Sequence, residues 1–327
     1  MSKLVTIFGG SGFVGRYITR RLAQDGWRIR VACRSPEEAG FVRTYGAVGQ
    51  VEPVFCNIRN DDSVRSVTRG VDAVINCVGV LAESGKNTFK AVQAEAPGRI
   101  ARIAREEAVT RMIQISAIGA DSESASAYAR TKAAGEAAVI EQMPGAVILR
   151  PSVVFGPEDE FFNRFAGMSR MGPVLPVVGA DTLFQPVYVD DVAAAAVAAL
   201  DDHTAQGVYE LGGPDVATFR DLMHRMLAVV QRKRIVANIP FPIARLMAGG
   251  FGLLKTVTLG LVTPPLTTDQ VRNLGVDNVV SDGARGLRDL GVTPTSIDSV
   301  LPDYLWRFRP SGQYTAIKNS AKNLKKS

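Results

Sequence analysis

The chain has 327 residues, of which 46% are hydrophobic, so it can bury a sizeable core but is short of two large independent domains. Its net charge of +6 and pI near 9.3 suit nucleic acid, anionic lipid or a phosphorylated ligand, and equally an ordinary basic soluble protein. Aromatic residues are not interleaved with the basic ones as nucleic-acid platforms require, so we expect no nucleic-acid partner. No run of about 18 uncharged apolar residues occurs, which argues against a membrane span.

The cysteines and histidines limit which metal sites and catalytic groups the chain can form. Cys33, Cys56 and Cys77 each end a strand-like run and lack metal-type spacing, so we expect buried reduced thiols, a reducing compartment and no metal site. The only histidines are His203 and His224, and no Ser/His/Asp arrangement is readable. The first strand-like run begins at residue 4, so we expect no signal or transit peptide and, for a complete gene product, a bacterial source.

Apolar runs typical of strands alternate with segments long enough for crossover helices. The predicted strands cover residues 4–8, 28–33, 51–55, 72–78, 111–116 and 146–151. Between the first two, residues 13–25 carry Val14, Ile18 and Leu22 at helical spacing. Because the strands are nearly continuous in apolar residues, the pattern predicts an α/β fold with a doubly wound parallel sheet covered on both faces.

The regular alternation of strand-like and helix-like segments ends at Pro151. Residues 151–187 are rich in proline and glycine and predict a loop-rich stretch, and residues 190–200 predict a helix with Asp190 and Asp191 in its first turn. The predicted division is a larger domain of 1–155 plus roughly 183–211, a smaller C-terminal α/β lobe of roughly 156–182 and 212–310, and a basic tail of 311–327.

A glycine-rich turn stands between the first strand and the first helix, in TIFGGSGFVGRY at 6–17. Glycine allows a sharp turn and a close backbone approach to a pyrophosphate, and a helix N-terminus offers unpaired N–H groups to phosphate oxygens. A plain tight turn is the alternative, but the strand before and the helix after it favour a dinucleotide site. The residues expected at the cofactor phosphates are Gly9, Ser11, Gly12, Phe13, Val14 and Gly15.

The end of the second strand, in VACRSPEE, bears on which nucleotide is bound. An NAD site usually places a carboxylate there to bind the ribose hydroxyls. Here that position is Cys33 and Arg34 follows, and a guanidinium can bind a 2′-phosphate that a carboxylate would repel. We therefore predict NADPH rather than NADH as the cofactor, the alternative being that Arg34 is a solvated surface charge.

Two further strand ends are suited to the rest of the cofactor. Asn57 and Ile58 follow the third strand, and Val78 and Gly79 follow the fourth, where glycine permits close backbone approach. We expect these four residues to line the part of the site that holds the adenine and nicotinamide groups.

A tyrosine and a lysine stand four residues apart in SAYARTKAAGEAAV, at Tyr128 and Lys132. On a helix this spacing places both side chains on one face. A lysine can lower the pKa of a neighbouring phenol and hold the nicotinamide ribose, and the phenol can then act as general acid for a carbonyl that accepts hydride. Tyr128 and Lys132 are therefore the candidate catalytic residues, and they are also expected to contact the cofactor.

With these motifs in order, the chain resembles the short-chain dehydrogenase/reductase superfamily in its extended or atypical branch. The resemblance is carried by GGSGFVG, NCVG, YARTK, LRPSVVFGP and PVYVDDVAAA over about 200 residues. It implies a dinucleotide-binding Rossmann domain, a smaller substrate lobe, and a cofactor that touches Tyr128, Lys132 and the loop containing Pro151 and Val154.

One position departs from that superfamily, in which active members usually carry a Ser or Thr just past the fifth strand. Here the strand ends IQISAIGAD, and the hydroxyl position falls on Ala117 or Ile118. Ser116 could replace it if its side chain faces the site, and we count Ser116 among the cofactor-binding candidates. Loss of such a donor costs several kcal/mol of transition-state stabilisation, so catalysis is in question while cofactor binding is not.

Within the superfamily the chain is most similar to the dehydrogenase-like accessory subunits of respiratory complex I (NADH:ubiquinone oxidoreductase). The carrying residues are ISAIGADSESASAYARTKAAGE, VLPVVGADTLFQPVYVDD and PPLTTDQVRNLGVDNVVS. The resemblance implies a structural NADPH, vestigial Tyr128 and Lys132, and a place where the peripheral and membrane arms meet near the quinone site. The alternative is a free NADPH-dependent reductase or epimerase acting on a small carbonyl substrate.

The C-terminal half should differ between these two functions. Residues 239–266 are apolar and broken by glycine, and form either buried lobe core or a surface element that meets membrane or a partner. The tail adds Lys318, Lys322, Lys325 and Lys326, suited to an anionic membrane surface or to a solubilising tail. If the chain is an accessory subunit of complex I, we expect it peripherally on the cytoplasmic face of a bacterial inner membrane, or on the matrix side of the inner membrane in a mitochondrion.

Overall fold

The computed structural model describes the backbone of residues 3–257 and 267–312, and all their side chains except those of 251–257. The chain divides into two compact units, which are described separately. The first comprises the chain up to Ser152, Val189–Gly212 and Val280–Pro294; the second comprises Val153–Tyr188, Gly213–Val279 and the residues from Thr295.

A seven-stranded sheet forms the centre of the first unit, with the order β3-β2-β1-β4-β5-β6-β11. Its strands are β1 (Leu4–Phe8), β2 (Arg28–Cys33), β3 (Val51–Phe55), β4 (Ala73–Asn76), β5 (Arg111–Ile115), β6 (Val147–Pro151) and β11 (Gly207–Leu211). Every neighbouring pair is parallel. All residues of β4 and β5 are buried, as expected of a sheet covered on both faces. The predicted doubly wound α/β fold is therefore confirmed.

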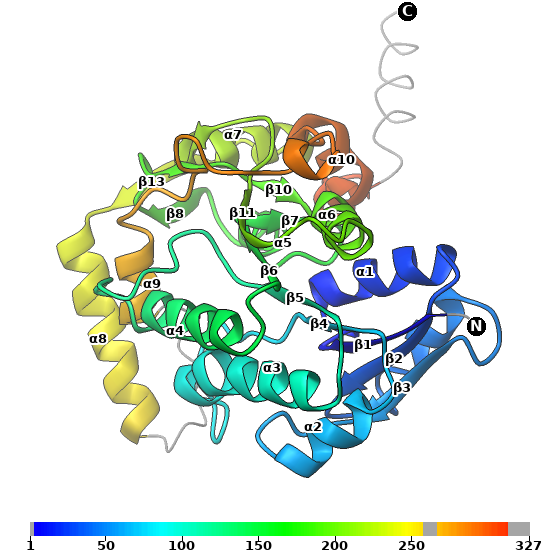
Figure 1. The fold of residues 1–327 in the computed structure, drawn as a ribbon. Coiled ribbons are helices and arrows are strands. Elements are labelled where there is room, and N and C mark those ends of the chain that lie inside the picture. Colours follow the sequence, from blue (N-terminus) through cyan, green and yellow to red (C-terminus); the bar gives the residue numbers. More distant parts are fainter. Residues whose placement is uncertain (1–2, 258–266, 313–327) are drawn as a thin grey trace, which may run out of the picture. The chain divides into compact units, whose positions relative to one another are not determined.

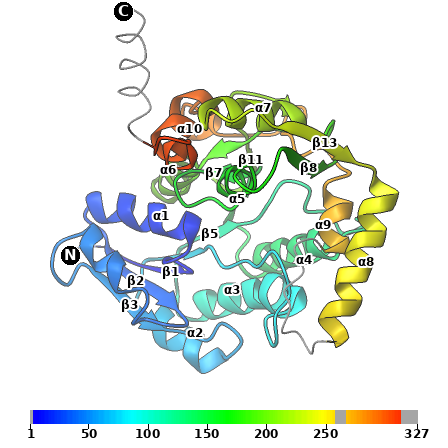
Figure 2. The same cartoon turned by 180° about the vertical axis from the view of Figure 1, so that it is seen from behind.

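Helices cover both faces of this sheet (Figures 1 and 2). On one face lie α1 (Phe13–Gln24) and α6 (Val189–Asp201), and on the other lie α2 (Asp61–Thr68), α3 (Ala96–Glu106) and α4 (Ala127–Gln142). The shorter helical segments are η1 (Gly40–Tyr45), the π-helical η2 (Lys90–Glu95), which runs into α3, and η3 (Arg288–Leu290). The helix predicted at 13–25 and the one predicted at 190–200 are both present within one residue of their expected ends.

The fourth strand is shorter than the predicted 72–78. It ends at Asn76, whose side-chain oxygen accepts a hydrogen bond of 3.1 Å from the backbone N–H of Val78. The Asn76 amide nitrogen in turn donates to Gln114 Oε1 at 2.9 Å. The Asn76 side chain thus supplies the hydrogen bond that a neighbouring strand would otherwise give to Val78. The strand therefore ends just before the predicted cofactor residues Val78 and Gly79.

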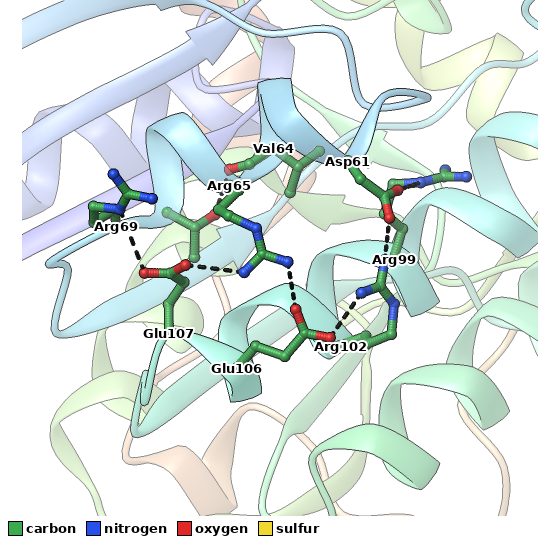
Figure 3. Close-up of polar contacts among 9 residues, drawn as sticks. Asp61, Val64, Arg65, Arg69, Arg99, Arg102, Glu106 and Glu107 are labelled. Carbon is green, nitrogen blue, oxygen red and sulfur yellow. Dashed lines mark hydrogen bonds and ion pairs between the residues drawn. The ribbon is translucent and has the colours of Figure 1, made fainter.

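An ion-pair network joins α2 to α3 (Figure 3). Asp61 accepts hydrogen bonds from Arg99 at 2.7 Å and from Arg102 at 2.5 Å, and Arg102 also pairs with Glu106 at 2.7 Å. Glu106 also pairs with Arg65 at 2.5 Å. Single exposed pairs contribute little, but a shared network of this kind fixes the two helices at one edge of the unit.

The second unit is a mixed α/β assembly around its own apolar core. Its strands are β7 (Val154–Phe155), β8 (Val174–Val178), β9 (Leu183–Phe184), β10 (Val187–Tyr188), β12 (Ala217–Thr218) and β13 (Ile235–Ile239), which pair two by two. Its helices are α5 (Phe162–Met168), α7 (Phe219–Val229), α8 (Phe241–Val257), α9 (Thr268–Asn273), α10 (Ile297–Leu305) and the short η4 (Trp306–Phe308). The loop-rich prediction for 151–187 is wrong in part, because α5 and β8 lie there and bury Phe162 and Leu175.

The apolar segment predicted at 239–266 has both buried and exposed apolar side chains in its described part. Ala244 and Ala248 of α8 are buried against Val271 of α9. Away from these two alanines, Leu246 and Met247 of α8 are 79% and 41% exposed. Part of this segment is therefore core of the second unit and part is exposed, while residues 258–266 and the tail lysines lie outside the described residues. No helix in the described part of the chain is both long and apolar enough to cross a membrane.

Candidate functional site

The carboxyl ends of the parallel strands share one edge of the first unit's sheet, where most of the predicted site residues lie. The strand order reverses between β1 and β4, which is the place where open parallel sheets bind ligands. The residues at this edge are Gly9 after β1, Arg34 after β2, Asn57 after β3, Val78 after β4, Ser116 after β5 and Pro151 at the end of β6. The structure thus brings together strand ends that are far apart in the sequence.

Two of the three glycines are required by the protein itself. Gly9 has φ of +73°, a conformation that favours glycine, and its N–H donates to the Ala32 carbonyl at 2.9 Å. A Cβ on Gly15 would lie 2.2 Å from the Gly9 carbonyl oxygen and 2.8 Å from the Gly10 Cα. Helix α1 can therefore pack this closely on the β1 turn only with glycine at position 15.

Gly12 has no such internal reason to be glycine. It caps the N-terminus of α1 with φ of −72°, which any residue can adopt, and a Cβ there would meet a single atom within 4 Å, the Gly9 oxygen at 3.2 Å. A side chain at Gly12 would fill the open space in front of the helix end, which is where a pyrophosphate would lie. The residues present therefore fit a dinucleotide.

The end of α1 carries the electrostatic features of an anion site. Its first turn contains no acidic residue, and the backbone N–H groups of Phe13, Val14 and Gly15 have no acceptor among the described residues. Such groups together carry about half a positive charge. Ser11 is half-buried in the turn that leads into them. No protein group among those described neutralises this end of the helix.

Both cationic and anionic groups surround the end of β2. Arg34 is exposed, and within the described residues it makes no ion pair or hydrogen bond. Arg59, beyond β3, donates from Nε to Asn57 Oδ1 at 3.2 Å, while its Nη1 is buried without an acceptor. Burial raises the pKa of Cys33, and nearby Glu37 raises it further. Arg59 was not predicted from the sequence because only the fold brings it to this edge, and Glu37, three residues after Arg34, was given no role.

The residues predicted along the cofactor track have the following contacts. Asn57 receives hydrogen bonds at Oδ1 from the backbone and side chain of Arg59, so its amide nitrogen is left as a donor. Ile58 is half-buried beside it. A Cβ on Gly79 would meet only one atom within 4 Å, the Lys132 Nζ at 3.5 Å, so Val78–Gly79 leaves space in front of the lysine.

Helix α4 positions the tyrosine and the lysine. It begins after Ser126, whose hydroxyl accepts a hydrogen bond of 3.3 Å from the Ala129 N–H. A Cβ on Gly135 would lie 2.0 Å from the Gln93 carbonyl oxygen, so glycine lets α4 approach η2 closely. The Lys132 ammonium lies 5.8 Å from the centre of the Tyr128 ring. The predicted shared face of these two side chains is present.

Burial dominates the electrostatics of this pair. It lowers the pKa of Lys132 to about 8, although Glu136 and Cys77 act in the opposite direction. It raises the pKa of Tyr128 to about 12. The expectation that Lys132 lowers the pKa of the phenol is therefore wrong for this structure, in which burial is the cause of the shift and raises the pKa.

Ser116 does not serve as the missing hydroxyl donor. It is buried, and its Oγ donates to the Glu136 carboxylate, which also receives hydrogen bonds from Arg150 at 3.0 Å and 2.6 Å. Ala117 and Ile118 follow with side chains that carry no hydrogen-bond donor. Glu136 and Arg150 were missed by the sequence analysis, although Glu136 stands one helical turn beyond Lys132.

The remaining predicted residues are divided between the two units. Pro151 ends β6 in the first unit, and its carbonyl accepts a hydrogen bond of 3.0 Å from the Ile118 N–H. Val154 belongs to β7 of the second unit, where it pairs with Val187.

The three cysteines are free thiols. Burial raises the pKa of Cys56 to about 11 and that of Cys77 to about 12. Among the described residues no group of three or more His, Cys, Asp or Glu side chains is arranged to hold a metal.

The fold, the glycine turn and the tyrosine–lysine pair define a nicotinamide-dinucleotide-binding protein. Residues 5–212 match the NAD dependent epimerase/dehydratase family, and the chain belongs to that family. A solved NADPH-dependent quinone oxidoreductase from Escherichia coli, complexed with NADPH, superposes with a TM-score of 0.70 at 17% identity over 92% of this chain and 98% of that chain. Family membership and the solved neighbour support a nicotinamide cofactor and do not by themselves distinguish NAD from NADP.

Two curated relatives extend the comparison. The chain is 36% identical over 316 residues to the mitochondrial NADH dehydrogenase (ubiquinone) 1 alpha subcomplex subunit 9 of Arabidopsis thaliana, covering 94% of this chain and 79% of the relative. It is 31% identical over 241 residues to the ceramide reductase of Caulobacter vibrioides (strain NA1000 / CB15N), covering 73% of this chain and 74% of the relative.

Proposed function

We propose that this chain is an NADPH-binding accessory subunit of respiratory complex I that turns over no substrate of its own. The observation that carries the proposal is the extent of one similarity. The family match ends at residue 212, whereas the alignment to the plant subunit covers 94% of the chain and therefore most of the second unit. The fold of the second unit is shared with reductases such as the quinone oxidoreductase, so the proposal depends on the sequence identity to the plant subunit, which extends beyond the family match.

The choice of NADPH follows from the charges at the ends of β2 and β3. Cys33 stands where NAD sites usually place a carboxylate, and the exposed Arg34, which has no ion pair among the described residues, offers guanidinium donors for a 2′-phosphate, while Arg59 adds a second positive charge beyond β3. Glu37 opposes this choice as a nearby anion. Two cations against one exposed carboxylate favour the phosphorylated nucleotide.

The residues of the first unit would hold the cofactor along the sheet edge. The turn around Gly12 and the free N–H groups of Phe13 and Val14 would bind the pyrophosphate, and the Asn57 amide and Ile58 would meet the adenine. Lys132, buried and still largely protonated near neutral pH because its pKa is about 8, would donate to the ribose hydroxyls. When bound, the nicotinamide is the group that can supply a hydride.

The geometry supports cofactor retention without turnover. Tyr128 keeps its proton up to a pKa of about 12 and could donate one hydrogen bond to a substrate oxygen. The second donor that active family members place beside it is missing, because Ser116 is bonded to Glu136, and Ala117 and Ile118 carry none. Removal of one such donor typically costs a factor of about 100–1,000 in rate.

The proposed location of the chain at the membrane follows from the proposed partner, respiratory complex I. A complex I subunit of this kind would lie at the junction of the peripheral and membrane arms near the quinone site. It would be peripheral on the matrix side of the inner membrane, or on the cytoplasmic face if bacterial. The exposed Leu246 and Met247 on α8, within the 239–266 segment, and the basic tail would face a partner subunit or the anionic membrane surface.

Complementation of a deletion strain tests this proposal. Cells that lack the gene should regain complex I assembly, read as NADH:ubiquinone activity and as the size of the complex on native gels, when they express the wild type or Tyr128→Phe. Gly12→Asp places a negative charge at the phosphates and should fail in both readouts. The proposal is contradicted if Tyr128→Phe fails as Gly12→Asp does, or if the deletion leaves complex I intact.

A free reductase is the second candidate, and the 31% identity to a ceramide reductase favours it. In this second candidate, Tyr128 would act as the general acid and Lys132 would bind the ribose. Steady oxidation of NADPH by the purified wild type with a physiological carbonyl, abolished by Tyr128→Phe, would establish this candidate instead.

A further inference from the structure

A cavity of about 550 Å³ opens on the second unit, where α7 ends and the chain turns into β13. Its lining residues are His224, Leu227, Ala228, Gln231, Arg232, Lys233 and Arg234. Three consecutive cations line it and none of the lining residues is acidic. It is made by a different unit from the glycine turn, so the proposed cofactor site does not account for it.

The local backbone fixes the two arginines of this cavity. Gln231 has φ of +55°, which ends α7 sharply, and Arg232 then donates from Nε to the Phe308 carbonyl at 2.9 Å. Arg234 donates from Nε to the Ser169 carbonyl at 2.7 Å. Both Nη groups of Arg232 and the Nη2 of Arg234 have no acceptor among the described residues. The guanidiniums are thus held in place while donors remain available.

The cations gather without a counter-charge. Arg170 directly follows Ser169, whose carbonyl accepts the hydrogen bond from Arg234. Burial lowers the pKa of Arg232, and the positive charges of Arg234 and Arg170 lower it further. Within the described part of the chain, none of Arg170, Arg232, Lys233 and Arg234 has a carboxylate within 4.0 Å. Like charges held together raise one another's free energy, and a bound anion would relieve this repulsion.

Helix capping explains only part of this arrangement. Arg309 donates to the Val229 carbonyl at 2.8 Å, which is ordinary stabilisation of the C-terminus of α7 by a cation. The side chains of Lys233 and Arg170 cap nothing among the described residues, and both are exposed. Their presence beside Arg232 and Arg234 therefore calls for a different explanation.

We propose that this cavity, here named the basic pocket (His224, Arg232, Lys233 and Arg234, with Arg170 beside it), binds a phosphate group. Guanidinium groups match phosphate oxygens with paired charge-assisted hydrogen bonds. The volume exceeds that of a single phosphate, and Leu227 and Ala228 add apolar wall, so the ligand is a phosphate ester. Its source is either a phospholipid headgroup or a soluble phosphate ester, and both share this chemistry.

The two histidines provide a direct assay. His224 lines the basic pocket, and His203, exposed in the first unit, is the only other histidine. Imidazole NMR signals of the full chain, saturated with NADPH so that its phosphate cradle is filled, are followed as glycerol phosphate is added. In a second arm, sedimentation with phosphatidylcholine vesicles is compared with and without phosphatidylglycerol. Lys233→Gln is the test variant, and Arg105→Gln, an exposed cation of α3 in the first unit, is the control.

Each outcome decides the proposal. A saturable shift of the His224 signals that Lys233→Gln weakens roughly fivefold, with His203 and the control unchanged, supports a soluble phosphate ester. Binding to phosphatidylglycerol vesicles that only Lys233→Gln weakens supports a headgroup. The proposal is overturned if neither ligand binds, or if Lys233→Gln and Arg105→Gln weaken binding equally, which would show that only net charge matters.

Discussion

Alanine substitutions at Gly12 and Gly15 separate the two roles of the glycine turn. In Gly15→Ala the new Cβ lies 2.2 Å from the Gly9 oxygen, so backbone must move. Overpacking of this kind costs about 1–3 kcal/mol or more, against a helix-propensity gain of at most about 1 kcal/mol. In Gly12→Ala the nearest atom is 3.2 Å away and φ is ordinary, so the loss is limited to a poorer N-cap, about 1 kcal/mol at most.

Thermal unfolding with and without NADPH reads both effects. A ligand that binds only the folded state at a hundred times its dissociation constant stabilises by about 2.7 kcal/mol, which raises Tm by roughly 5–10 °C for a unit of this size. We expect Gly15→Ala to lower the Tm of the free protein. Gly12→Ala should leave that Tm within a few degrees of the wild type and lose most of the NADPH-induced rise. A full NADPH-induced rise in Gly12→Ala would refute the reasoning, because no phosphate would then approach this position.

Further predictions concern cofactor choice, pH, the buried network and the tail. Arg34→Ala should lower the NADPH-over-NADH affinity ratio and Glu37→Gln should raise it, as measured by calorimetric titration; unchanged ratios in both would exclude this edge as the selector. NADPH affinity should fall as pH rises through 8, because the pKa of free Lys132 is about 8 and its ammonium form donates charge-assisted hydrogen bonds that are stronger than those of the neutral amine; Lys132→Met should bind weakly with no such fall. Ser116→Ala removes a buried hydrogen bond to a carboxylate and should lower the free energy of unfolding by about 1–3 kcal/mol while NADPH still binds, whereas loss of binding at full stability would assign the hydroxyl to the cofactor. Truncation after Pro310 should keep the nucleotide but weaken association with complex I-containing membranes, and unchanged sedimentation would show that the tail is dispensable.

The sequence predicted those parts of the fold that depend on local pattern. Strands such as 4–8 and 51–55 were predicted to the residue because their apolar runs end at glycine or polar residues. The end of β4 was misjudged because Asn76 bonds to the backbone of Val78, a contact that periodicity does not reveal. The return of residues 280–294 to the first unit also depends on tertiary packing and not on local pattern.

The candidate site shows the same division. The spacing of Tyr128 and Lys132 on one helix face could be read from the sequence, since helical geometry fixes it. The direction of the Ser116 hydroxyl could not, because it is decided by Glu136 and Arg150, which come from α4 and β6. The pKa of Tyr128 was predicted in the wrong direction because burial of the ring cannot be read from spacing.

Native mass spectrometry of the protein isolated from the membranes of its own cells tests the central claim most directly, because it reads bound nucleotide and co-purifying chains together. We expect one NADPH on each copy of this chain, retained through gentle purification, and subunits of complex I attached to it. A chain that fractionates wholly as a soluble species, with no complex I subunit and no nucleotide, would contradict the account.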